Sequence, residues 1–243
     1  MHLVPVRQLR IRFNRGVSAE AWPPLIDGTY AIILTLLVIE LPILVLDLLR
    51  DYNHEEIGVL ALLASIGRLL FGYLGVFLVV YDIWSKKRQL LDVLASTGMV
   101  SKFESAMLLL SLFLASLLPP FYYVLNQLRQ DYGVTLQKLQ GAAIASVEKI
   151  EVDVLSSLFL IVGISIYALI AFAAHRRSTK MAKVIDVAPF VSLRFDALTR
   201  IALALLLPVF YLFIPVPWPG VVYGLSAFIR FEPGKVVKGA PGD

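Results

Sequence analysis

The sequence contains no cysteine and only three histidines among its 243 residues. Without cysteine the chain can form neither a disulfide framework nor a thiolate metal site. The histidines (His2, His54 and His175) are far apart in the sequence, and the chain has no HExxH, GxSxG, GxxxxGK[ST] or GxGxxG pattern. A membrane enzyme would need clustered His, Asp or Glu near one interface, and no catalytic site can be assembled from the residues present. We therefore expect no enzyme activity, no metal and no cofactor.

Charged residues are also scarce. They make up 16% of the chain, whereas hydrophobic residues make up 58% and the mean hydropathy is +0.79. A soluble domain is about 45–50% apolar, so this composition predicts an all-α integral membrane protein. The net charge of +4 is what basic loops give such a protein. Nucleic acid is a poor partner for so apolar a chain.

The apolar residues fall into six segments that can be compared with the roughly 20 residues a helix needs to cross a membrane. The first follows a basic flank, but it is too long for a signal peptide and lacks a cleavage site, so we expect it to be retained. The sixth is short and follows the breaker string Pro215–Gly220. The expected spans are Leu25–Leu49, Ile57–Trp84, Ser105–Leu128, Val154–His175, Ile201–Ile214 and Gly220–Ile229. Residues 25–229 then form one six-helix transmembrane domain, between a basic segment (1–24) and a tail (230–243).

The basic residues alternate from loop to loop in a way that agrees with six spans. Seventeen of the 22 Lys and Arg residues fall on one side of this topology, four fall on the other, and Arg68 lies within a span. Cytoplasmic loops collect Lys and Arg, so both termini are expected to be cytoplasmic. We expect the connector Lys86–Glu104 to lie as an amphipathic segment at the inner surface, and Ala182–Ala197 to be a basic inner linker.

Polar groups on the first apolar segment raise the question of function. Ile32, Thr35, Leu36 and Ile39 share one helical face, with spacings of i, i+3, i+4 and i+7. From the pattern alone, a packing face between helices is favoured over a pore or ligand face. Asp27 lies just after Pro23-Pro24, where it is either a carboxylate at a helix N-terminus or a hydrogen-bonding node of the structure.

Two further charges lie within the spans. Glu40 falls in the outer half of the first span, and Arg68 is expected near the middle of the second. An unpaired charge in a membrane is expensive, so we expect a salt bridge between them rather than a role in permeation. Gly67, Gly72 and Gly75 allow close packing of the second helix.

The polar positions of the first span also suggest a family. Asp27-Gly28, followed by Thr35 and Glu40 at the matching offsets, resembles the signature helix of the transmembrane protein 175 family, the endolysosomal potassium channels and their prokaryotic homologues. The run that ends at Trp84 resembles the family's second helix, and Leu109–Phe121 is similar to its third. The resemblance covers roughly residues 25–125.

The chain departs from the family pattern around Asp27. Leu25-Ile26 replaces Phe-Ser, Ala21 replaces an arginine, and Lys86-Lys87 replaces a histidine pair. The hydrogen-bond network that the family builds around this aspartate is therefore expected to be incomplete.

The resemblance implies a potassium-permeable, leak-type cation channel in which the first helix lines the central pore of a homotetramer. Ile32 would form a narrow apolar ring, with Thr35, Leu36 and Ile39 beside it, and no TVGYG-type filter loop is present. A structural polar network would comprise Asp27, Glu40, Arg68 and Trp84. The expected partners are monovalent cations, the lipid bilayer and further copies of the chain, and the expected location is a prokaryotic plasma (inner) membrane.

Two alternatives stay open. The chain could be a secondary transporter that uses the Glu40/Arg68 pair, or a non-conducting membrane protein. A transporter would usually show an internal repeat and broken helices, and the sequence shows no repeat.

Overall fold

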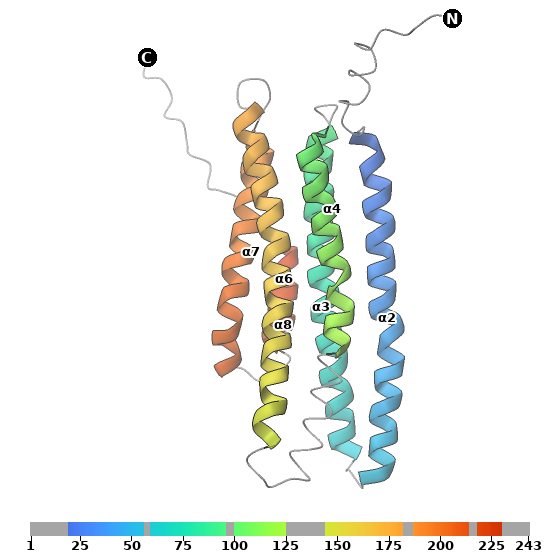
Figure 1. Cartoon of the computed structure of the whole chain (residues 1–243). Coiled ribbons are helices and arrows are strands. Elements are labelled where there is room, and N and C mark those ends of the chain that lie inside the picture. Colours follow the sequence, from blue (N-terminus) through green and yellow to red (C-terminus); the bar gives the residue numbers. More distant parts are fainter. Residues whose placement is uncertain are drawn as a thin grey trace, which may run out of the picture.

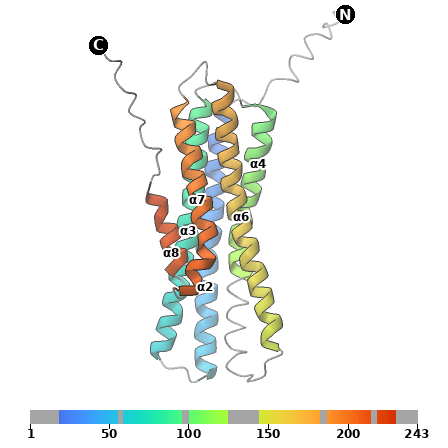
Figure 2. The same ribbon diagram turned by 90° about the vertical axis from the view of Figure 1, so that its left-hand side faces the viewer.

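A computed structural model describes residues 19–55, 59–95, 100–124, 144–181, 187–213 and 218–229. In these residues the fold is all-helical, and the long helices lie side by side along a common axis (Figures 1 and 2). Successive helices run in opposite directions. The α-helices are α2 (Trp22–Glu55), α3 (Val59–Ala95), α4 (Lys102–Ser116), α6 (Ile144–Met181), α7 (Ala188–Phe213) and α8 (Trp218–Leu225), with 3₁₀ turns at Ala19–Ala21 and Ser226–Phe228.

Four helical segments of the described chain are long and apolar enough to cross a membrane. They are Trp22–Arg50, Val59–Asp92, Lys102–Val124 and Ser156–Lys180. The first four expected spans are therefore confirmed by length and composition, and the protein is a multi-pass membrane protein.

The last two expected spans take a different form. α7 begins at Ala188 rather than near Ile201, and it ends well short of the lower ends of α2 and α3 (Figure 1). α8 has 8 residues. At 1.5 Å per residue it is about 12 Å long, so it cannot cross a core of about 30 Å alone. The count of six spans stays a prediction.

Both expected connectors are wrong in their boundaries. α3 continues without a break to Ala95, so the residues after Trp84 extend a spanning helix instead of lying along the surface. α4 then starts with a capping box, in which the Ser101 hydroxyl accepts from the Glu104 amide and the Glu104 carboxylate accepts from the Ser101 amide. α7 starts with Pro189 in its first turn, where a proline needs no hydrogen-bonded N–H. The inner linker is correspondingly shorter.

Glycines set the close approach of α8 to α3. A Cβ on Gly224 would lie 2.8 Å from the carbonyl oxygen of Gly75, and a Cβ on Gly72 would clash with the Tyr122 hydroxyl. Small residues let membrane helices approach each other closely, so two of the three glycines noted in the second span have a packing role. Gly67, in contrast, faces open space.

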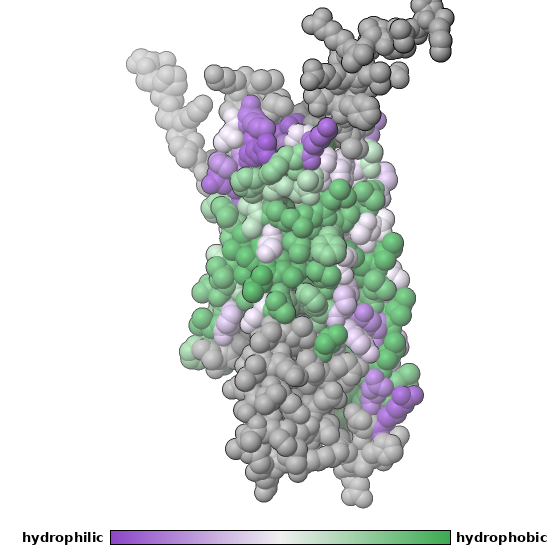
Figure 3. Space-filling model, in the orientation of Figure 1, coloured by the Kyte–Doolittle hydropathy of each residue, from purple (hydrophilic) through white to green (hydrophobic). Residues whose placement is uncertain are grey.

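The surface of the bundle has a membrane-like distribution of polarity. On the face shown in Figure 3, hydrophobic side chains cover the middle of the molecule, and hydrophilic side chains gather at the end where α6 ends and α7 begins. The buried core lies between the helices and is mostly aliphatic and aromatic.

Candidate functional site

One face of α2 is left uncovered by the other described helices. Ile32 is 62% exposed, and Leu36, Ile39 and Thr35 are exposed beside it. Leu37, which points to another face of the same helix, is 1% exposed and packs in the core. An apolar face of this kind must meet lipid, a partner copy or a pore, because nothing in the described part of the chain covers it.

Thr35 places a hydroxyl on this face without a hydrogen-bonding cost. Its Oγ1 donates to the carbonyl oxygen of Ala31 at 2.7 Å, one turn back in α2. Thr29 makes the same bond to Leu25, at 2.8 Å. Such back-bonding satisfies the hydroxyl proton inside an apolar environment and leaves the oxygen able to accept a hydrogen bond or face a cation.

Asp27 forms the polar node that ties the start of α2 to α3. Its Oδ1 accepts a 2.8 Å hydrogen bond from the Trp84 indole, and its Oδ2 accepts a 2.6 Å bond from Arg88. Arg88 also lies 3.5 Å from Asp92 on its own helix. The Asp27 network was expected to be incomplete, and that expectation is wrong in one respect. Because α3 does not end at Trp84, Arg88 is carried one turn further along the helix and supplies the cation.

A second tie between the same helices uses a lysine in place of the missing histidine. The Lys87 side chain is fully buried, and its Nζ lies 5.0 Å from the centroid of the Tyr30 ring. A cation over an aromatic face is attracted by the ring quadrupole, more strongly when both are desolvated. The two lysines that replace the histidine pair thus make different contacts. Lys87 lies against Tyr30, whereas Lys86 lies between Asp82 and Asp196.

The expected salt bridge between Glu40 and Arg68 is not formed between these two described residues. Arg68 instead bonds within its own helix, to the Ala64 carbonyl at 3.4 Å and to the Ser65 hydroxyl at 3.2 Å. The Oε2 atom of Glu40 is buried without a hydrogen-bond partner.

The position of Arg68 along the bundle explains why it needs no carboxylate. Arg68 precedes Trp84 by 16 residues, which is about 24 Å along a helix. If Trp84 marks one edge of a core about 30 Å thick, Arg68 lies near the other edge and not near the middle as expected. A long basic side chain there can reach the interface.

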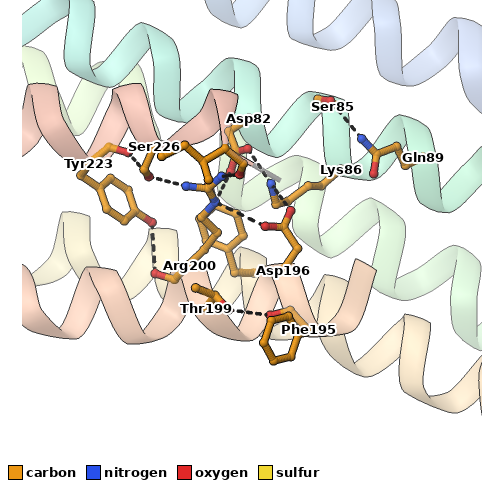
Figure 4. Close-up of polar contacts among 12 residues, drawn as sticks. Asp82, Ser85, Lys86, Gln89, Phe195, Asp196, Thr199, Arg200, Tyr223 and Ser226 are labelled. Carbon is orange, nitrogen blue, oxygen red and sulfur yellow. Dashed lines mark hydrogen bonds and ion pairs between the residues drawn. The ribbon is translucent and has the colours of Figure 1, made fainter. Parts of the chain in front are cut away.

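The largest polar cluster of the described chain was not anticipated from the sequence. Two acids and two bases, all buried, form a quartet between α3 and α7 (Figure 4). The Lys86 ammonium lies between Asp82 and Asp196, at 2.5 Å and 2.7 Å. The Arg200 Nε lies 3.4 Å from Asp82 and 3.9 Å from Asp196. The formal charges of this quartet cancel.

Other helices join the quartet through hydrogen bonds. The Tyr167 hydroxyl on α6 donates to Asp82 at 2.6 Å. Arg200 also donates to the Ser226 hydroxyl and, at 2.9 Å, to the Ile229 carbonyl. These two groups lie just past the end of α8, where backbone carbonyls lack partners within the helix. The quartet therefore fixes α3, α6, α7 and the end of α8 together.

A separate buried pair joins α4 to α6. Arg177 lies 3.3 Å from a carboxylate oxygen of Glu104, the same residue that completes the capping box at Ser101. One carboxylate thus both starts α4 and holds it against α6.

The sequence contains a spacing of acids and bases that indicates the quartet. Asp82 and Lys86 are four residues apart, as are Asp196 and Arg200. Acid and base at i and i+4 share a helix face, and two such pairs near the ends of apolar helices indicate charges that meet inside a bundle. Hydropathy instead predicts Lys86 and Arg88 in one connector and Asp196 in another, whereas the residues lie in α3 and α7.

No group of three or more His, Asp and Glu side chains in the described residues is placed to hold a metal ion. The acids of the quartet are neutralised by bases and a tyrosine at hydrogen-bond distance.

Comparison with known proteins gives a family for the part of the chain that contains α2, α3 and α4. Residues 24–119 match the family model described as "Endosomal/lysosomal potassium channel TMEM175". No curated protein and no solved structure matches the chain. The matched region includes the exposed face of α2, Asp27 and the residues of α3 that bind it. Residues 24–119 are therefore similar to the TMEM175 family, whose activity at the family level is that of a potassium channel.

Proposed function

We propose that this protein is a potassium-permeable, leak-type cation channel in which four copies of α2 line a central pore. The observation that carries the proposal is the uncovered apolar face of α2, which lies within the region that matches a potassium channel family. Ile32 is the most exposed of the apolar candidate residues and forms the narrow ring. Thr35, Leu36 and Ile39 continue the lining.

An apolar ring can control permeation without a carbonyl filter loop. Where the ring is narrow, a hydrated cation must shed part of its water shell, and an empty constriction can lose its water altogether. Potassium sheds water more readily than sodium, so such a ring favours potassium. The hydroxyl oxygen of Thr35, one turn beyond the ring, can stand in for part of the lost hydration.

Oligomeric assembly follows from the geometry of one helix. A single apolar face per chain cannot enclose a pore, and closed cyclic symmetry brings identical faces together around an axis. We propose a homotetramer, as the resemblance implies. The Asp27 node and the Lys87–Tyr30 contact then act as supports that hold α2 from the side opposite the pore.

The transporter alternative loses its main support. It depended on a pair of charges within the spans, and Glu40 and Arg68 are not joined in the structure. We propose that both termini are cytoplasmic, because the basic residues fall on alternate loops. The proposed location in a prokaryotic plasma membrane rests on the resemblance to the prokaryotic homologues alone.

Single-channel recording of the purified protein in planar bilayers tests the proposal. Ile32→Asn hydrates the ring, so conductance should rise and the preference for potassium over sodium should fall. Leu37→Asn is the matched control on the buried face, and it should reduce the yield of folded protein without altering permeation in the channels that form. Currents that Ile32→Asn leaves unchanged in both conductance and selectivity would show that this face does not line the narrow point.

Cysteine accessibility gives an independent check in this cysteine-free chain. Cysteine at position 32, 35 or 39 should make the current sensitive to silver ions or to a small water-soluble thiol reagent. Cysteine at position 37 should not.

A further inference from the structure

Basic side chains that have no acidic partner among the described residues form an arc at one end of the bundle. The arc runs from the start of α4 across α6 to α7 and comprises Lys102, His175, Arg176 and Arg194. Lys102, His175 and Arg194 are exposed and Arg176 is half-buried. In the described part of the chain, no carboxylate lies within ion-pair distance of either arginine. This contrasts with Arg177 and Arg200, which are buried and paired with acids.

Each arginine of the arc is held in a way that leaves donors free. The Arg176 guanidinium lies over the Phe103 ring, 4.0 Å from its centroid. Stacking occupies the face of the guanidinium and leaves its in-plane N–H groups available for a bidentate contact. The Arg194 guanidinium lies 2.9 Å from Nδ1 of His175, which uses one of its five donors. The Arg194 side chain is exposed, so the other donors are accessible.

The arc lies at the depth of lipid headgroups. The Tyr167–Asp82 bond sets α6 level with α3, and His175 and Arg176 follow Tyr167 by eight and nine residues. That is about 12–14 Å along α6, or roughly 10 Å beyond the level of Trp84. Tryptophans gather at the membrane interface, and the headgroup layer lies immediately outside the core.

Exposed apolar side chains continue from the arc toward the membrane core. Phe103 contacts Phe172 edge to face at 6.3 Å, and Phe172, Phe195 and Leu198 are all exposed. Figure 3 shows the hydrophilic end above a broad hydrophobic face in this region. A ligand that fits both parts has an anionic head and apolar chains.

We propose that the basic arc is a binding site for the phosphate headgroup of an anionic phospholipid, with the acyl chains on the aromatic surface of α6 and α7. A lipid fits better than an acidic protein because the arc is continuous with the apolar face and lies at headgroup depth. Arg176 and Arg194 bind the phosphate oxygens, and Lys102 adds a further positive charge. Lipid binding at this site does not depend on ion conduction, so the test of the site is independent of the test of the proposed channel.

Native mass spectrometry of the full-length protein tests the site. The protein in detergent is mixed with equal amounts of phosphatidylglycerol and phosphatidylcholine of matched acyl chains, and the ratio of retained adducts is measured. Each arginine near an anionic headgroup contributes about fivefold. The double variant Arg176→Gln/Arg194→Gln should therefore lose more than about tenfold of the phosphatidylglycerol preference, and each single variant part of it.

The control is Arg50→Gln, which removes the same charge at the opposite end of the bundle, where Arg50 is paired with Asp47. It should retain the wild-type preference. Retention of that preference in the double variant, or an equal loss in Arg50→Gln, would overturn the site. Excess inorganic phosphate should leave the lipid adducts in place. Displacement by phosphate would refute the contribution of the apolar surface and show a simple anion site.

Discussion

The buried quartet of Asp82, Lys86, Asp196 and Arg200 allows a prediction about stability. Asp82→Ala removes the carboxylate nearest to Lys86, Tyr167 and Arg200. Two buried cations then share Asp196 alone, and one positive charge is left uncompensated. Breaking a buried ion pair by removing one partner costs about 3–5 kcal/mol. We expect Asp82→Ala to reduce the free energy of unfolding by about that amount.

The measurement is a titration with sodium dodecyl sulfate in mixed micelles, followed by circular dichroism. Asp92→Ala is the matched control, because Asp92 lies on the same helix and its side chain is 62% exposed, 3.5 Å from Arg88. An exposed pair contributes about 0–1 kcal/mol, so the control should change stability little. A loss below about 1 kcal/mol for Asp82→Ala would show that the quartet does not stabilise the fold.

A double-mutant cycle separates the quartet from simple packing. Lys86→Met and Asp196→Leu each leave an unbalanced charge, whereas the double variant leaves Asp82 opposite Arg200 in a neutral pair. The double change should therefore cost less than the sum of the single changes by about 1–3 kcal/mol. Strict additivity would refute the electrostatic account, because packing losses alone give no such coupling.

Three further outcomes follow from the contacts of α2 and α3. Arg88→Gln should destabilise the protein by about 1 kcal/mol in the same titration, since its bond to Asp27 is charge-assisted but the pair is partly exposed; a neutral result would show that Asp27 is held by Trp84 alone. Glu40→Gln should leave the free energy of unfolding unchanged or raise it, because it removes a charge whose Oε2 atom is buried without a partner. Arg68→Ala should lower the free energy of unfolding by less than about 1 kcal/mol. A large loss of stability in either variant would indicate that the residue is paired within the oligomer. Thr35→Val should alter bilayer conductance or selectivity only modestly, because the hydroxyl proton is already bonded to its own helix, and complete loss of current would show a direct ligand.

The helical periodicity of the sequence predicted correctly which residues of α2 share a face, because this feature depends on a single helix. The spacing of Ile32, Leu36 and Ile39 placed them on one face, and the structure leaves that face exposed while Leu37 is buried. The resemblance also placed Asp27 and Trp84 in one polar network, and the two are joined by a 2.8 Å hydrogen bond. Whether the exposed face lines a pore is a property of the assembly, which a single chain does not contain.

Helix boundaries were harder to predict because charge was taken as a sign of a loop. Lys86, Arg88 and Asp196 were assigned to connectors, yet all three lie within α3 or α7. A helix can keep charged residues inside a bundle when each finds a partner on a neighbouring helix. A hydropathy profile scores these residues as polar and therefore ends the predicted helix before them. The i, i+4 spacing of acid and base would have extended the predicted helix through them.

The pairing of charges across helices depends on the depth of each residue and on the helix face that it occupies, and a hydropathy profile gives neither. Glu40 and Arg68 were paired because both lay within spans and carried opposite charges. The contact between Asp27 and Trp84, however, sets the level of α3 against α2, since two residues that bond must lie at the same depth. From that contact, Glu40 lies about 20 Å and Arg68 about 24 Å along their helices, so the two are close in depth yet do not bond. The side of the helix decides the outcome, because Arg68 turns to Ser65 on an exposed face while the Glu40 oxygen is buried. Opposite charge and equal depth are therefore insufficient evidence for a salt bridge in a membrane helix pair, and a shared face is the third condition.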